Sequence, residues 1–208
     1  MLNIFKLTRL ARLLKLILRY LQKNTRVKDT IRQYDGIVAK ARDIFEKKLR
    51  DYGPTWRLLR TISITDQLFI KAKRIRSIQM KGANKINESI DTEFYALYNY
   101  SIIALIQEEL DLVDEPDLSL TQAMKLYDMK SGEIKNLMLK KNHDYGEAWR
   151  DMSIESMTDF ILVKIYRIKQ ILQNKGKTLI SEGIESNIMD IANYAVFALI
   201  LINEKKEI

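Results

Sequence analysis

The amino-acid sequence predicts an all-α protein, a pseudo-symmetric helical bundle built from two tandem helical-hairpin repeats. Two prolines and seven glycines among 208 residues are too few for the frequent turns of a strand-rich fold. Leu, Lys, Glu and Ala, which favour helices, are abundant. The third observation is a repeated sequence motif: RDYGPTWR at residues 50–57 is similar to HDYGEAWR at residues 143–150.

The first 28 residues form a basic segment that we treat as a separate N-terminal helix. They hold eight cations and no acid, which equals the net charge of +8, so the body of the chain, residues 29–208, is neutral. A neutral body makes nucleic acid an unexpected partner. Residues 1–24 place cations on one arc of a helix and Leu and Ile on the other. Three interpretations remain open: a helix packed on the body, a helix that docks on a membrane surface or a partner, and an import-type leader or mis-assigned start.

The cysteine and histidine content narrows the classes of site. The chain has no cysteine and a single histidine, His143, which excludes a disulfide framework and a Cys/His zinc site. This composition suits a cytoplasmic protein, with a membrane-peripheral location if the N-terminal helix docks on a bilayer.

The two copies align over most of the chain. The aligned segments are KKLRDYGPTWR (47–57) with KKNHDYGEAWR (140–150), TDQLFIKAKRIRSI (65–78) with TDFILVKIYRIKQI (158–171) and, after one inserted residue, NYSIIALI (99–106) with NYAVFALI (193–200). The predicted organisation is repeat unit 1 at residues 29–110, an acidic connector at 111–120 and repeat unit 2 at 121–208. The units should pack as one domain, because neither hairpin can bury its apolar face alone. An internal duplication can replace a dimer or enlarge one, so homo-oligomerisation stays open.

Each unit is predicted to hold the same elements in the same order. A helix ends at the glycine of DYG, Gly53 or Gly146, where the left-handed conformation caps it. After a loop with Trp and Arg, Ser63 and Ser156 are predicted to cap the middle helix, which ends at a Lys-Gly turn. A longer helix closes the unit. Two shorter helical stretches are expected between the connector and the second DYG.

The closing helix of unit 2 carries the first candidate site. Three carboxylates and an amide share one arc of its helical wheel: Glu182, Glu185, Asp190 and Asn193. Oxygen ligands of this kind suit Mg²⁺. A solvated helix start, stabilised by the helix dipole, is the alternative. In unit 1, Glu88 and Asp91 fall in register with Glu182 and Glu185, but Ala96 stands where unit 2 has Asp190, which favours the second unit as the competent one.

The middle helices repeat a pair of cations one turn apart, Lys71 with Arg74 and Lys164 with Arg167. Such cations either bind the phosphates of a substrate or neutralise the neighbouring carboxylates as structural ion pairs.

The repeated loops carry the remaining candidates for substrate binding, which are Trp56, Arg57, Asp144, Tyr145, Trp149 and Arg150. A loop Trp can stack on a base and an Arg can bind a phosphate with two hydrogen bonds. The alternative is a Trp that anchors the loop on the core.

The segments KKNHDYGEAWR, TDFILVKIYRIKQI and SEGIESNIMDIANYAVFAL resemble a bacterial and phage family, nucleotide modification associated domain 1, in two copies over residues 30–205. That family is similar to the all-α nucleoside triphosphate pyrophosphohydrolases of the MazG type, which use Mg²⁺ on E-x-x-E and E-x-x-D helices. The resemblance implies a MazG-like bundle in which Glu182, Glu185 and Asp190 are the catalytic, metal-side carboxylates. The chain departs from the MazG pattern where E-x-x-E is replaced by Lys164-x-x-Arg167.

The resulting expectation is a nucleotide-binding protein with Mg²⁺-dependent hydrolysis of nucleoside triphosphates. Two alternatives are a non-catalytic nucleotide-binding accessory module and a helical interaction protein that docks through residues 1–24.

Overall fold

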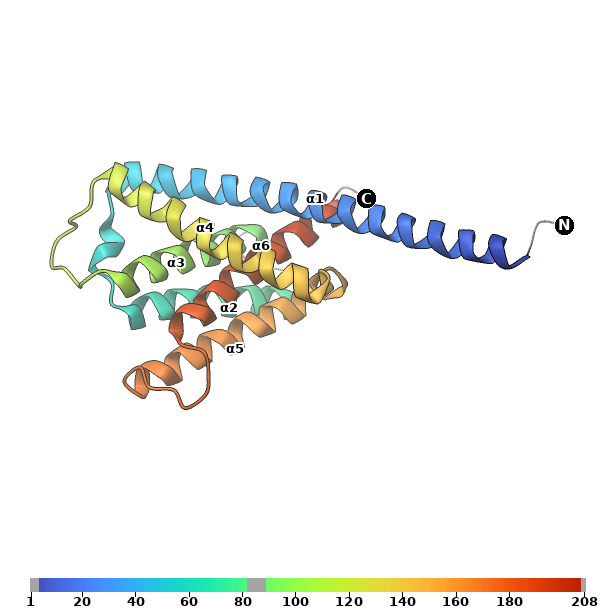
Figure 1. Cartoon of the computed structure of the whole chain (residues 1–208). Helices are drawn as coiled ribbons and strands as arrows, with labels where there is room; N and C mark the ends of the chain where they lie inside the picture. Colours follow the sequence, from blue (N-terminus) through green and yellow to red (C-terminus); the bar gives the residue numbers. More distant parts are fainter. Residues whose placement is uncertain (1–3, 82–88, 207–208) are drawn as a thin grey trace. The chain divides into compact units, whose positions relative to one another are not determined.

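The computed structural model describes residues 4–81 and 89–206, and all regular structure within these ranges is helical (Figure 1). This confirms the all-α class. The elements in order are α1 (Ile4–Tyr52), η1 (Thr55–Leu58), α2 (Thr61–Lys81), α3 (Ile90–Glu109), α4 (Leu120–Tyr145), η2 (Ala148–Asp151), α5 (Ile154–Gln173) and α6 (Ile184–Lys206), where η denotes a 3₁₀ helix.

The chain divides into two compact units, Met1–Gly36 and Ile37–Ile208. The first unit is helical from Ile4 onward, as part of α1, which continues without a break to Tyr52. Among its first 28 residues the described side chains include only Lys15, which is exposed, so the predicted amphipathic face lies outside the described side chains. The packed, docking and leader interpretations of residues 1–28 all stay predictions.

The second unit contains both repeats, and its centre is a four-helix bundle. In each repeat a hairpin places the middle helix against the closing helix, α2 against α3 and α5 against α6. Between repeats, α3 packs on α6 and α2 packs on α5, while α4 lies across α3 and α6 (Figure 1). This arrangement confirms the predicted pseudo-symmetric bundle.

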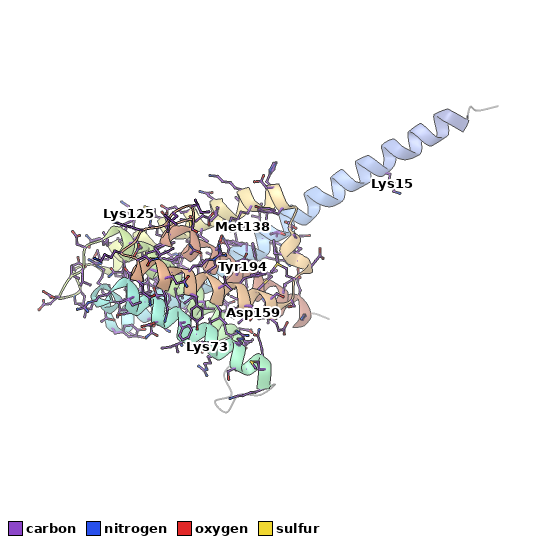
Figure 2. The ribbon with its side chains drawn as sticks, turned by 90° about the horizontal axis from the view of Figure 1, so that it is seen from below. Lys15, Lys73, Lys125, Met138, Asp159 and Tyr194 are labelled. Carbon is purple, nitrogen blue, oxygen red and sulfur yellow. The ribbon has the colours of Figure 1, made fainter. Side chains whose placement is uncertain are left out.

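Two ion pairs between α2 and α5 show the internal symmetry at the level of residues. Lys169 Nζ lies 2.6 Å from Asp66 Oδ1, and Arg76 Nε lies 3.7 Å from Asp159 Oδ1. In the alignment of the repeats, Asp66 corresponds to Asp159 and Arg76 corresponds to Lys169, so the symmetry exchanges the two pairs. Reciprocal contacts of this kind characterise a twofold interface, here within one chain. Asp159 is labelled in Figure 2.

The closing helices form the core because they are apolar on nearly all sides. From Ala192 to Ile202, every residue of α6 except Tyr194 is buried, and α3 is buried along most of its length. A helix that is apolar all round needs neighbours on every face. By length and composition α6 could also cross a bilayer, but 72% of its most apolar window is buried inside the fold, as expected of a core helix.

Two local predictions were wrong. Ser153, not Ser156, caps α5, since its Oγ accepts a hydrogen bond from the Ser156 backbone N–H at 3.0 Å, and α2 already begins at Thr61, before Ser63. Because η2 ends at Asp151, only two residues separate it from α5, and the cap of α5 lies about one turn before the predicted position. The connector is followed by one unbroken helix, α4, and not by two short ones, because a glycine at position 132 does not interrupt it.

The predicted glycine caps are confirmed. Gly53 and Gly146 have φ angles of 69° and 63°, in the left-handed region that glycine adopts without steric cost. Each cap turns the chain from the first helix of its repeat into the 3₁₀ helix that carries Trp and Arg.

Candidate functional site

A cavity of about 660 Å³ lies in the first repeat. The end of α1, η1, the middle of α2 and the first half of α3 supply its walls. Pockets for small organic ligands typically enclose 300–1,000 Å³. The first repeat therefore has room for a ligand of nucleotide size.

One part of the cavity wall is aromatic. Tyr52, Trp56, Tyr95 and Tyr100 line it from α1, η1 and α3. Tyr52 is 56% exposed, whereas Trp56 and Tyr95 are buried. The wall therefore offers flat apolar surfaces, which can stack on a planar ring, both at the mouth and in the interior.

Charged side chains form the other part. Four cations line the cavity against two acids: Lys40, Lys48, Lys71, Arg74, Asp91 and Glu93. Glu93 is buried and held by both middle-helix cations, with Lys71 Nζ at 3.3 Å and Arg74 Nη1 at 2.5 Å from its carboxylate oxygens. The lining therefore has an excess of positive charge. The N-terminus of α3 at Ser89 and Asp91 also borders the cavity, and a helix N-terminus attracts anions.

The indole of Trp56 distinguishes this wall from its counterpart in the second repeat. Trp149 Nε1 donates to Asn142 Oδ1 at 3.1 Å, and its ring stacks on Phe197 at a centroid distance of 4.2 Å. Leu49 stands where the second repeat has Asn142, and Trp56 Nε1 is buried without a hydrogen-bond partner among the described residues. A buried donor without a partner is costly, so a ligand acceptor at this place would relieve it.

The same region of the second repeat is closed by an ion cluster. Asp190 is buried on α6, with Lys141 Nζ at 2.5 Å from one carboxylate oxygen and Lys164 Nζ at 2.7 Å from the other. Burial lowers the pKa of Lys141, but the hydrogen bond and charge of Asp190 outweigh it and raise the pKa overall. Tyr194, which is labelled in Figure 2, interacts with Asp190 and Lys141 of this cluster, and burial together with the charge of Asp190 raises the pKa of its phenol.

The predicted acids of the closing helix do not share one face in the structure. Glu182 precedes α6, which begins at Ile184, and both Glu182 and Glu185 are exposed. Asp190 is buried between two lysines instead. Among the described residues no group of three or more His, Asp or Glu side chains is placed to hold a metal ion. Glu88 lies outside the described residues, and the magnesium site stays a prediction.

Arg57 and Arg150 fasten their 3₁₀ helices to the end of a closing helix. The guanidinium of Arg57 is fully buried and donates to Asp117 Oδ1 at 2.7 Å, to the Asp111 carbonyl oxygen at 2.7 Å and to Gln107 Oε1. Arg150 Nη1 donates to Glu204 Oε1 at 2.7 Å. Arg57 is not among the residues that line the cavity. The structure thus gives the repeated arginine a structural role.

The repeated asparagine also has equivalent structural contacts in both copies. Asn99 Nδ2 donates to the Ala41 carbonyl oxygen at 3.0 Å, and Asn193 Nδ2 donates to the Ile134 carbonyl oxygen at 3.4 Å. Ala41 and Ile134 are equivalent positions on the helices that lead into the two DYG turns. Each asparagine therefore docks a closing helix on the first helix of its repeat.

The remaining candidates of the second repeat lie near the surface. Asp144, Tyr145 and Arg167 are exposed, and Tyr145 is 73% exposed. Arg167 borders a second, more open hollow of about 940 Å³ together with Glu182. Asp144 and Tyr145 line neither this hollow nor the cavity of the first repeat, so they do not share a cavity with Arg167 and Glu182.

Sequence reasoning missed several cavity residues. Lys40 and Tyr95 belong to no repeated motif, whereas Tyr100 and Lys48 lie in the aligned segments NYSIIALI and KKLRDYGPTWR but were not selected as candidates. The useful signals were differences between the copies, Ala96 against Asp190 and Leu49 against Asn142. These positions separate the open repeat from the closed one.

Comparison with protein families matches the nucleotide modification associated domain 1 model twice, at residues 48–107 and 141–202. The chain belongs to this family. The matches cover more than half of the chain and confirm both the resemblance and the duplication. No curated protein and no solved structure matches the chain. The similarity to MazG-type enzymes stays a prediction.

Proposed function

We propose that the protein binds a nucleotide in the cavity of the first repeat. The observation that carries this proposal is a cavity of about 660 Å³ that combines an aromatic wall with an excess of cations. A nucleotide has the matching parts, a planar base and a negatively charged phosphate group. Membership of the nucleotide modification associated family supports the same ligand class.

The chemistry of the walls assigns a role to each part. Tyr52, Tyr95 and Tyr100 supply faces on which a base stacks, and Trp56 Nε1 supplies a hydrogen-bond donor. Lys71 and Arg74 supply cations for the phosphate side, and Glu93 lies against both of them. The substrate-binding roles predicted for Lys71, Arg74 and Trp56 belong to this proposal.

Isothermal titration with nucleosides and with nucleoside mono-, di- and triphosphates tests the proposal. We expect saturable binding of nucleotides, and Tyr52→Ala should weaken it about tenfold, which corresponds to one stacking contact. Tyr145→Ala is the matched control, because Tyr145 is equivalent in sequence but lines neither cavity. The absence of any nucleotide binding to the wild-type protein would refute the proposal.

Mg²⁺-dependent hydrolysis is a finer form of the proposal. Asp91 supports it, since this predicted metal ligand lines the cavity beside Lys71 and Arg74. Incubating the protein with nucleoside triphosphates and Mg²⁺, and analysing the products by chromatography, tests this step. Turnover that Asp91→Asn abolishes, while Glu185→Gln leaves it intact, would place the chemistry in the first repeat. Loss through Glu185→Gln alone would place it in the second.

The non-catalytic alternative predicts binding without product. In that case nucleotides raise the melting temperature equally with and without Mg²⁺, and the triphosphate is recovered unchanged.

A further inference from the structure

In the second repeat the carboxylate of Asp190 occupies a position at which the first repeat has no acidic side chain. Lys141 and Lys164 converge on the Asp190 carboxylate, at 2.5 and 2.7 Å. Their equivalents in the first repeat are Lys48 and Lys71, and both line the cavity.

The position of Asp190 is occupied by Ala96 in the first repeat, and Ala96 also lines the cavity. We propose that Lys48 and Lys71 bind the phosphate chain of the ligand above Ala96, at the place where Asp190 holds the equivalent lysines in the second repeat. This subsite rests on the proposed function and defines which part of the cavity receives the phosphates.

Three observations support the assignment. First, two equivalent lysines bind an oxyanion in the same chain, in a fold that the internal symmetry reproduces. Second, the exchange of Asp for Ala removes a negative charge and three heavy atoms, which leaves both space and positive charge. Third, Lys48 has no ion-pair partner among the side chains that the structure describes, whereas Lys141 has one.

Lys71 is partly engaged already, because its Nζ lies 3.3 Å from Glu93. That distance is longer than the 2.7 Å of its equivalent, Lys164, to Asp190. Glu93 also interacts with Arg74 at 2.5 Å, so Lys71 can turn toward a ligand without leaving Glu93 unpaired. In the second repeat Asn187 stands at the position of Glu93, and Lys164 forms its ion pair with Asp190.

The arrangement also explains how the two repeats differ around this position. In the second repeat Asp190 and its two lysines fill this part of the fold. The duplication has therefore produced one open anion site and one site occupied by the chain itself.

The test uses the full-length protein and inorganic tripolyphosphate, which carries the anionic group without a base. We expect wild-type protein to bind it, and Ala96→Asp to lose at least about thirtyfold in affinity, because the variant recreates the internal anion. Ala96→Asn has nearly the same volume without the charge and should retain most of the affinity.

Lys48→Gln provides a second variant that does not add volume to the interior. It should weaken tripolyphosphate binding about tenfold, as expected for one charged contact. Lys47→Gln is its matched control, since Lys47 is exposed, pairs with Asp43 and does not line the cavity. Circular dichroism and urea unfolding verify that each variant folds. If Ala96→Asp does not fold, the comparison of Lys48→Gln with Lys47→Gln decides the test.

The outcomes separate this subsite from the proposed function. Equal tripolyphosphate affinity of the wild type and Ala96→Asp, equal losses in Ala96→Asp and Ala96→Asn, or no effect of Lys48→Gln overturns the subsite. If tripolyphosphate binds as expected but no nucleotide binds, the subsite stands and nucleotide binding fails. If nucleotides bind but Ala96→Asp changes neither the nucleotide affinity nor the tripolyphosphate affinity, nucleotide binding stands and the phosphate subsite is refuted.

Discussion

The two repeats share a fold but treat one pair of lysines in opposite ways. In the second repeat Lys141 and Lys164 both pair with the buried carboxylate of Asp190. In the first repeat Ala96 stands at the same position, and a cavity remains with Lys48 and Lys71 in its wall. The exchange of Asp for Ala thus distinguishes a repeat in which both lysines pair with one carboxylate from a repeat in which both line a cavity.

The comparison also changes the meaning of the repeated residues. Residues that are identical in both copies build structural contacts. The Asn of the closing helix binds an equivalent carbonyl oxygen in each repeat, whereas the Arg of the 3₁₀ helix has different partners in the two repeats. We expected the second repeat to be the competent one because it has the additional acid. In the structure the additional acid is engaged by two lysines, and the cavity of about 660 Å³ lies in the first repeat, so the competence of the second repeat stays a prediction.

The largest effect on stability is expected from Arg57→Ala. Arg57 is fully buried, and its loss would leave Gln107 and the connector around Asp117 without their shared partner. We expect a loss of about 4 kcal/mol in the free energy of unfolding, measured by urea denaturation. The equivalent Arg150→Ala should cost less, about 3 kcal/mol, because Glu204 is 37% exposed and regains water, although Glu147, at 4% exposed, also loses its contact with Arg150.

The same contact predicts a pH dependence. The hydrogen bond from Arg57 lowers the pKa of Asp117 below its ordinary value. A lowered pKa in the folded state stabilises the protein above the unfolded pKa, and this contribution is lost as the pH falls through the folded value. The stability difference between wild type and Arg57→Ala should therefore narrow from about pH 5 to about pH 2. A constant difference over that range would contradict the role given to Asp117.

Asp190→Ala should convert the closed repeat toward the open one. Lys141 and Lys164 would lose their counter-ion, at a cost of about 2 kcal/mol, since Lys141 is 41% exposed and can be rehydrated. Titration with tripolyphosphate should then reveal a second, weaker binding event. Unchanged stability together with unchanged stoichiometry would show that the ion cluster does not hold the second repeat closed.

Asn142→Leu should reproduce in the second repeat the unpartnered indole of the first. Trp149 Nε1 loses its acceptor, and we expect a cost of about 1 kcal/mol. A double-mutant cycle with Trp149→Phe, which lacks the donor, isolates this interaction. A coupling energy of zero between these two substitutions would contradict the prediction, because it would show that Trp149 finds another acceptor.

The smallest effect is expected at the pseudo-symmetric ion pairs between α2 and α5. Asp66→Asn removes the pair with Lys169 and should cost about 0.5 kcal/mol, because Asp66 is 53% exposed. Asp159→Asn should cost less, since its pair with Arg76 is longer, at 3.7 Å. Both losses should shrink in high salt, and a loss that is insensitive to salt would exclude an electrostatic origin.

The sequence alone determined the helical class, the duplication and the glycine caps. These features depend on local composition, on repetition and on backbone conformation at Gly53 and Gly146, all of which are encoded within a few residues. It placed the cap of α5 wrongly because Ser153 and Ser156 are both plausible caps, and the length of the preceding 3₁₀ helix selects between them.

Which polar residues face a cavity depends on the packing of helices that are distant in sequence. A helical wheel places Asp190 and Glu185 on one flank, but it does not show that α4 and α5 bring Lys141 and Lys164 against Asp190 while Glu185 stays in solvent. The burial of a side chain and its partners depend on helices that are distant in sequence. For that reason the difference between Ala96 and Asp190 was visible in the sequence, whereas its consequence became visible only in the fold.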